Sequence, residues 1–167
     1  SLTFLASRRL GCGRLVSAGA ALGFAFGSVF WSQAVVAEVY TLNAAIVAGM
    51  MVALLTWSET RRPRWYYTAV ALFAAGLGHH TTIVGFAPGM ALFVLLVDRR
   101  FVLRLRTLTV TAGILTAGLL QYLFILLRSS QPDAYVESRA TTLGELAKIV
   151  LGRQFQDRLF AFGWHEL

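Results

Sequence analysis

Five apolar stretches separated by short polar segments dominate the pattern along the chain. A helix that crosses a bilayer needs roughly 20 apolar residues, within a range of about 17–25. The third and fourth stretches are short by this measure, so we expect tilted spans or a helical pair broken between them. The pattern therefore predicts an all-α, polytopic transmembrane helix bundle of about five spans. The stretches cover residues 15–30, 41–57, 65–77, 82–97 and 105–127.

The C-terminal residues differ from this pattern, so we divide the chain into a membrane region, residues 1–128, and an extracytoplasmic segment, residues 129–167. The sequence at 129–133 contains serines, a proline and an aspartate and is typical of a turn. Thr142 and Glu145 are three residues apart and fit a capping box. Apolar positions at helical spacing follow through about residue 160. We expect a short amphipathic helix on the outer membrane surface or beneath a catalytic domain.

Composition and charge agree with a membrane protein. The chain is 57% hydrophobic and 14% charged, whereas a soluble domain usually carries about 25% charged residues. The net charge of +7 does not indicate nucleic-acid binding, because the arginines lie in short clusters at alternate connections and not along one basic face. The single cysteine, Cys12, excludes an intrachain disulfide.

The arginine clusters predict an orientation. Cytoplasmic connections carry an excess of Lys and Arg, so the connections that hold the clusters should be cytoplasmic. The connections at residues 31–40 and 78–81 contain no Lys or Arg; these and the C-terminal tail should then be extracytoplasmic in a multi-pass protein of the cell membrane. The clusters contain Arg8, Arg9, Arg14, Arg61, Arg62, Arg64, Arg99, Arg100, Arg104 and Arg106.

A stripe of small residues marks the first apolar stretch. Gly19, Gly23 and Gly27 are four residues apart and share one helix face. Such a repeat allows another helix to approach closely. We interpret it as a tight contact within the chain; a dimer interface and a chance spacing in a glycine-rich helix are the alternatives.

The polar run at residues 31–43 is the first candidate site. An interfacial belt explains its aromatic residues, including Tyr40, but it does not explain a carboxylate, Glu38, at a membrane boundary. On one continuous helix Asn43 would lie about 140° from Glu38. A joint site therefore requires the helix to break near Tyr40. Glu38 would then accept hydrogen bonds from a hydroxylated ligand, or else pair with a metal or an arginine.

A second polar run, residues 79–82, contains His79 and His80. Adjacent histidines diverge on a helix and are not a metal pair, and we expect no zinc site. One or both rings could contact a phosphate or a sugar; the alternative is a pair of interfacial histidines that cap a short helix. Arg153 in the tail is a candidate for an anionic lipid phosphate, or else part of a solvated helix face.

These two runs, with Pro88 and the residues around Arg153, resemble bacterial members of the protein O-mannosyltransferase-like family of polytopic membrane proteins, in the GT-C class of glycosyltransferases. The resemblance covers residues 15–160 and is most specific in the run at 30–43. It implies transfer of a sugar such as mannose from a polyprenyl-phosphate donor to a protein or glycan hydroxyl on the outer membrane face. Some members use a divalent metal, so the resemblance allows for one as a cofactor.

The resemblance also limits what each residue is expected to do. By this resemblance the family's acidic outer-loop motif belongs upstream of Ser1, so we expect no catalytic base in this chain and no activity of the chain alone. Glu38, Tyr40, Asn43, His79, His80 and Arg153 are then candidate substrate-binding residues of the donor or acceptor cavity. The expected partners are membrane lipids, the polyprenyl-phosphate sugar and the acceptor.

A transporter or a non-enzymatic membrane scaffold is the competing hypothesis. Broken helices with polar ends also build transporter sites. A transporter, however, should show an internal repeat and polar groups near the membrane midplane. The chain has no evident repeat and its polar runs lie at the predicted outer boundary, which favours the enzyme.

Overall fold

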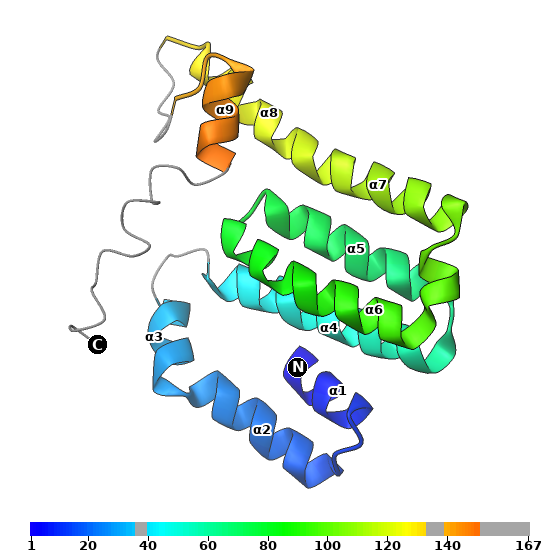
Figure 1. Ribbon diagram of the computed structural model, residues 1–167. Coiled ribbons are helices and arrows are strands. Elements are labelled where there is room, and N and C mark those ends of the chain that lie inside the picture. The colour runs from blue at the N-terminus through cyan, green and yellow to red at the C-terminus, as the bar shows by residue number, and fades with distance from the viewer. Residues whose placement is uncertain (36–39, 133–138, 151–167) are drawn as a thin grey trace, which may run out of the picture. The chain divides into compact units, whose positions relative to one another are not determined.

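The computed structural model describes residues 1–35, 40–132 and 139–150, and in this part of the chain every regular element is a helix (Figure 1). The all-α fold class is confirmed. Contacts divide the chain into two compact units, Ser1–Gly118 and Leu119–Leu167. The division predicted after residue 128 concerns the end of the membrane region, and it stays a prediction.

The first unit contains most of the helices. They are α1 Leu2–Arg9, α2 Arg14–Phe26, α3 Ser28–Val35, α4 Tyr40–Thr60, α5 Pro63–Leu77, the 3₁₀ helix η1 Thr81–Phe86, α6 Ala87–Val102 and α7 Leu105–Leu119, whose last residue opens the second unit. The second unit continues with η2 Leu120–Tyr122, α8 Leu123–Ser129 and α9 Leu143–Val150.

Three helical segments in the described residues are long and apolar enough to cross a membrane: Tyr40–Thr60, Thr82–Val102 and Leu105–Ser129. Helices α2 and α3 meet at a bend of 53° and would form a fourth span if they are counted together. Helix α5 has only 15 residues, fewer than the roughly 20 that a span needs. The predicted number of five spans therefore stays a prediction.

Helices α4 and α5 form the core of the first unit. Both bury positions i, i+3, i+4 and i+7, which lie on one face of a helix: residues 50, 53, 54 and 57 of α4, and residues 66, 69, 70 and 73 of α5. Trp57 is 1% exposed, and its ring lies 5.3 Å from that of Tyr66 and 5.7 Å from that of Phe101 of α6. The two apolar faces therefore bury each other, and α6 closes one end of the contact.

Helix α7 runs parallel to α5. The hydroxyls of Tyr66 and Thr111 lie 3.1 Å apart, and further along the pair a Cβ at Gly118 would lie 2.6 Å from the backbone oxygen of Ala74. The sequence separation between Tyr66 and Thr111 is nearly the same as that between Ala74 and Gly118, as expected for two helices that run in the same direction. The start of α5 therefore lies beside the start of α7, and the backbones approach closely only because residue 118 has no side chain.

The glycine stripe of α2 does not make the predicted contact within the described residues. A Cβ at Gly19 or Gly23 would meet nothing within 4 Å. Gly27 adopts an extended backbone with ψ 135° and separates α2 from α3, so the stripe does not continue along one helix. The interpretation as a tight contact within the chain is therefore wrong for these residues. The close approaches occur instead at Gly118 and at Gly76, where a Cβ would overlap the Ile83 side chain.

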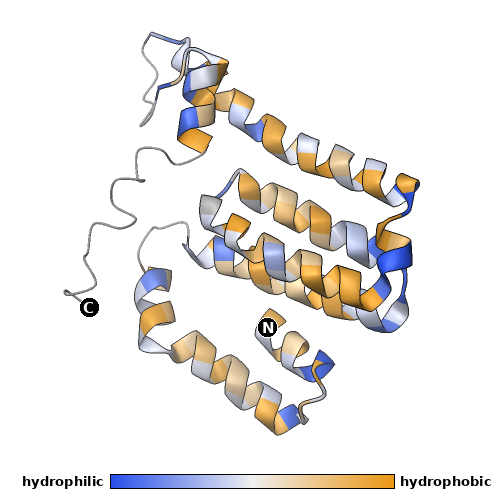
Figure 2. Ribbon diagram, in the orientation of Figure 1, coloured by the Kyte–Doolittle hydropathy of each residue, from blue (hydrophilic) through white to orange (hydrophobic). Residues whose placement is uncertain are grey.

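The arginine clusters gather at one end of the first unit, which we call the basic end. Arg9 at the end of α1 pairs with Glu59 at the end of α4. Arg61 donates to the backbone oxygen of Val97 at 2.6 Å, which brings the α4–α5 connection to the end of α6. Figure 2 shows hydrophilic residues at these helix ends and hydrophobic ones between them. The alternation of charge thus corresponds to two ends of a bundle, while the membrane side of each end stays a prediction.

The capping box predicted in the tail is present in the second unit. The Glu145 carboxylate accepts from the Thr142 N–H at 3.3 Å, and the Thr142 hydroxyl accepts from the Glu145 N–H at 3.2 Å. Helix α9 follows at once and buries Leu146. The predicted continuation to residue 160 lies outside the described residues, and a position on the membrane surface stays a prediction.

Candidate functional site

At the other end of the first unit, the start of α4 and the connection from α5 to η1 bring polar side chains together. Helix α4 begins at Tyr40, so Asn43 lies one turn inside it. Helix α5 ends at Leu77, and His80 leaves helical geometry with φ −152° and ψ 126°. This extended backbone lets the His80 ring cap η1, because its Nδ1 accepts from the Thr82 N–H at 3.3 Å.

Tyr40, Asn43, His80 and Thr82 form one group, which we call the polar cluster. The Asn43 amide donates to the Thr82 hydroxyl oxygen at 3.4 Å, and this oxygen lies 2.7 Å from His80 Nδ1. The Tyr40 and His80 rings are 5.6 Å apart at 50°. Contacts between residues about 40 positions apart therefore join the start of α4 to the start of η1.

The hydrogen bonds assign a proton to the far side of the His80 ring. Both the N–H and the hydroxyl of Thr82 lie against Nδ1, and a nitrogen that accepts must be unprotonated. The proton of the neutral imidazole is then on Nε2, which is a donor. This tautomer is inferred from the network of hydrogen bonds. Since the Thr82 hydroxyl donates its hydrogen bond to Nδ1, its oxygen is available to accept from the Asn43 amide.

The Asn43 side chain has one unused acceptor. Its Oδ1 is buried and has no hydrogen-bond partner among the described residues. A buried acceptor without a partner costs about 1–3 kcal/mol. A ligand hydroxyl that reached this oxygen would recover that cost, so the polar cluster combines an acceptor with the Nε2–H donor of His80.

An apolar groove begins at the polar cluster. Tyr40 and Asn43 line a cavity of about 510 Å³. Other residues of α1 and α4 form its walls, together with Phe24 of α2 and Phe86. A second cavity of about 430 Å³ lies along the same face of α4. The two cavities share Leu10, Met51 and Phe86, so they adjoin, and we call them together the apolar groove.

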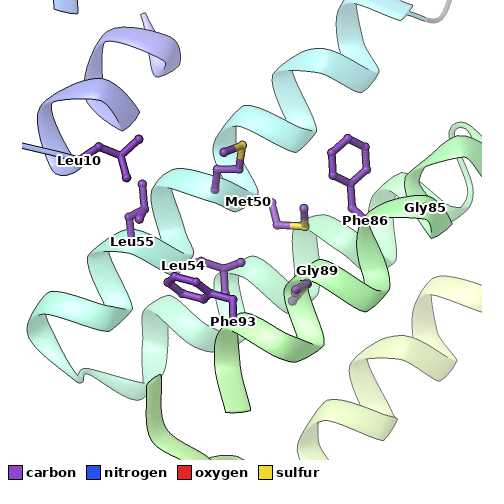
Figure 3. A pocket seen from close by; sticks show the side chains of 10 residues that line it. Leu10, Met50, Leu54, Leu55, Gly85, Phe86, Gly89 and Phe93 are labelled. Carbon is purple, nitrogen blue, oxygen red and sulfur yellow. The ribbon is translucent and has the colours of Figure 1, made fainter. Parts of the chain in front are cut away.

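Figure 3 shows the second part of the groove. Leu10, the residue after α1, lies across from Phe86 and Phe93, and Met50 and Leu54 of α4 lie between them. Every side chain that lines this part is apolar, and two glycines, Gly85 and Gly89, leave space on the η1–α6 side. This second part is therefore suited to an apolar chain, whereas the first part also has hydrogen-bonding groups, those of Tyr40 and Asn43 and the hydroxyls of Thr3 and Ser7 on α1.

The structure brings only some of the predicted site residues together. Tyr40, Asn43 and His80 come together in the polar cluster. The half-buried His79 donates its backbone N–H to Gly76, and the contacts that define the cluster run through His80. Glu38 and Arg153 lie outside the described residues. A substrate-binding role for all six residues stays a prediction.

The sequence did not single out Thr82 or the groove residues. Thr82 belongs to the second polar run. The sequence did not show that this run lies close to Asn43, which is what gives Thr82 its place in the cluster. The residues of the groove have no signal of their own, because Met51 and Phe86 look like ordinary membrane-facing positions. Within the described residues no group of three His, Cys, Asp or Glu side chains could hold a metal ion.

Comparison with known families decides the relationship of the chain. The family model described as the Protein O-mannosyl-transferase TMEM260 N-terminal domain matches residues 7–102, more than half of the sequence. The chain belongs to this family. The matched region runs from the end of α1 through α6 and contains the whole polar cluster. No curated protein and no solved structure gives a match.

Proposed function

We propose that this chain serves an integral-membrane glycosyltransferase of the GT-C class, which transfers a sugar such as mannose from a polyprenyl-phosphate donor to a protein or glycan hydroxyl. Membership of a protein O-mannosyl-transferase family supports sugar transfer. The observation that supports a lipid-linked donor is the apolar groove that ends at the polar cluster.

The groove suits the lipid part of such a donor. A prenyl chain offers only apolar surface, and each buried CH₂ group contributes about 0.8 kcal/mol. The second part of the groove has only apolar side chains and backbone. A chain bound there would direct its phosphate toward Asn43 and Tyr40, which line the first part.

The polar cluster suits the head of the donor. Asn43 Oδ1 would accept a hydrogen bond from a sugar hydroxyl, and His80 Nε2–H would donate to a phosphate or sugar oxygen. These are positioning roles, and no described residue is assigned as the catalytic base. Glu38, His79 and Arg153 remain candidates for further contacts with the donor or the acceptor. No step is routed through a metal.

The same end would face away from the cytoplasm. The arginine clusters lie at the opposite end, and basic residues favour the cytoplasmic side of a membrane. The polar cluster, the connections at 31–40 and 78–81 and the tail would then be extracytoplasmic, where a lipid-linked sugar meets secreted acceptors.

Transfer of labelled mannose from polyprenyl-phosphate mannose to an acceptor protein, measured with the full-length protein in membranes, tests this function. We expect Asn43→Leu to lower transfer by about tenfold or more, the equivalent of about 1.4 kcal/mol, and His80→Phe to have a similar effect. Ser58→Ala is the matched control, because Ser58 lies at the other end of α4 and its hydroxyl bonds only its own helix.

A rise in KM for the donor without a change for the acceptor would assign the polar cluster to the donor. Full transfer by the Asn43→Leu protein would remove the cluster from the site. Movement of a solute across the membrane without any sugar transfer would favour the transporter.

A further inference from the structure

An unneutralised patch of arginines lies at the basic end, away from the polar cluster. The two acidic residues of this end are already engaged: Glu59 pairs with Arg9, and an Asp98 oxygen lies 3.9 Å from Arg61. Among the residues that the structure describes, no carboxylate pairs with the remaining exposed arginines of this end. Apart from Arg8 and Arg14 beside α1 and α2, these belong to the ends of α5, α6 and α7 and form the arginine patch: Arg62, Arg64, Arg99, Arg100, Arg104 and Arg106.

The parallel packing of α5 and α7 puts four of these charges at one end of the helix pair. Tyr66 contacts Thr111, and Gly118 lies against Ala74, so the two helices run in the same direction. Arg62 and Arg64 at the start of α5 and Arg104 and Arg106 at the start of α7 are therefore at the same end. Neither helix has an acidic residue in its first turn, so the first turns themselves do not compensate these charges.

The last turn of α6 keeps the other two arginines outside. Asp98 leaves helical geometry, and its carboxylate accepts from the Phe101 N–H at 2.9 Å. Phe101 then packs against Tyr66 with ring centroids 5.4 Å apart. With this ring directed inward, Arg99 and Arg100 remain exposed.

Aromatic rings accompany the charges. The Arg64 guanidinium lies 5.2 Å from the Trp65 ring, and that of Arg104 lies 6.0 Å from the Phe101 ring. Tryptophan beside arginine is typical of the headgroup level of a membrane. Helices α4, α6 and α7 have ends at this level and contribute to the three segments long enough to cross.

We propose that the arginine patch binds the phosphate headgroups of anionic phospholipids. The guanidinium group matches a phosphate with two parallel hydrogen bonds, and the membrane supplies such headgroups at the depth of the patch. Zwitterionic lipids carry the same phosphate but cancel its charge, so the patch should select anionic lipids. If the arginines acted only in orienting the chain, lipid selectivity would not follow.

The test uses the full chain purified in detergent and titrated with phosphatidylglycerol, phosphatidylcholine or inorganic phosphate. We expect phosphatidylglycerol to bind and to raise the unfolding temperature, and the other two to have much less effect. An Arg64→Gln/Arg106→Gln protein should bind phosphatidylglycerol about 30-fold more weakly, at about 1 kcal/mol for each arginine near an anionic surface.

Two matched variants complete the design. Arg64→Lys/Arg106→Lys keeps the charges and should recover most of the affinity, whereas Arg128→Gln/Lys148→Gln removes the same charge from the second unit and should bind normally. Equal binding of both phospholipids would overturn the proposal, as would wild-type affinity in the Arg64→Gln/Arg106→Gln protein. Displacement of phosphatidylglycerol by equimolar inorganic phosphate would overturn the assignment to a lipid.

Discussion

The two ends of the first unit treat their polar groups in opposite ways. At the basic end the carboxylates of Glu59 and Asp98 lie near arginines, and Trp57, Tyr66 and Phe101 pack beneath them. At the other end the polar cluster leaves Asn43 Oδ1 buried without a partner among the described residues, beside the apolar groove. Among the described residues, Ser17 Oγ, one turn after Arg14 in α2, is also buried without a partner, but of these two residues Asn43 is the one that lines the groove.

This difference separates stabilisation from ligand binding. Packed rings and paired charges hold helices together, whereas an unsatisfied acceptor costs free energy until a ligand arrives. Sites that bind or react are commonly less stable than the structure that supports them. The comparison therefore indicates that α4 is anchored at one end and kept available at the other.

Removal of the central ring at the basic end should have the largest effect. Trp57→Ala removes a side chain that is 1% exposed, and we expect a loss of about 3–5 kcal/mol in the free energy of unfolding. The matched variant Trp31→Ala removes a ring that is 52% exposed and should cost about 1 kcal/mol or less. Denaturant unfolding of both purified proteins, followed by tryptophan fluorescence, measures the contrast. Equal losses would contradict the basic end as the anchor.

A methyl group between α5 and α7 should have an intermediate effect. At Gly118 a Cβ would lie 2.6 Å from the backbone oxygen of Ala74, so Gly118→Ala must push the helices apart at a cost of about 1–3 kcal/mol. On the same helix, a Cβ at Gly113 would meet nothing within 4 Å, so Gly113→Ala should be neutral or slightly stabilising. Thermal unfolding compares them, and similar shifts in both proteins would argue against the close contact.

Asn43→Leu should separate stability from function. The substitution removes the buried acceptor at the cost of one long hydrogen bond, so the free energy of unfolding should stay within about 1 kcal/mol of wild type or rise. Sugar transfer should nevertheless fall by about tenfold or more. Thermal unfolding of the ligand-free protein checks the first part. A large destabilisation would show that Asn43 is a structural residue, comparable to those of the basic end.

The carboxylate of Glu145 is held by hydrogen bonds from Thr141 and Thr142 and not by an arginine. Of these changes, protonation of this carboxylate should have the smallest effect on stability. The backbone N–H and then the hydroxyl of Thr141 donate to it, which lowers the pKa of this exposed carboxyl below its usual 4.5. The folded pKa is depressed, so the stabilisation of α9 is present above the unfolded pKa and is lost as the pH falls through the folded one.

Amide chemical shifts of residues 143–150 between pH 6 and pH 2 would follow this loss. Glu145→Gln should remove the pH dependence while α9 keeps the hydrogen bond from its own N–H to Thr142. A transition at or above the usual carboxyl pKa would contradict the capping box as the cause.

The sequence was sufficient where the signal is local. Apolar stretches predicted helices, and alternate arginine clusters predicted two unlike ends, because hydropathy and charge can be read from neighbouring residues. Thr142 and Glu145 likewise specify their capping box within one turn. The break predicted between the third and fourth stretches is present, because α5 ends at Leu77 and η1 begins at Thr81. The first stretch was less accurate: Gly27 adopts an extended backbone and separates α2 from α3, although the hydropathy continues across it.

Close approaches were not predictable in the same way. The glycines at 19 and 23 have the spacing of a helix contact, but a Cβ at either would meet no described residue within 4 Å, whereas Gly118 has no such pattern and touches a backbone. Whether the space beside a glycine is occupied depends on which helix packs there, and that packing depends on contacts across the whole unit.

The sequence alone thus determined the helical class, the polarity of the bundle and the candidate residues Tyr40, Asn43 and His80. Only the tertiary structure decided that His80 reaches Asn43 through Thr82 and that Asn43 lines an apolar groove. The physical reason is that hydropathy and charge act residue by residue. A cavity and an unsatisfied acceptor arise only when separate helices exclude water from the same space.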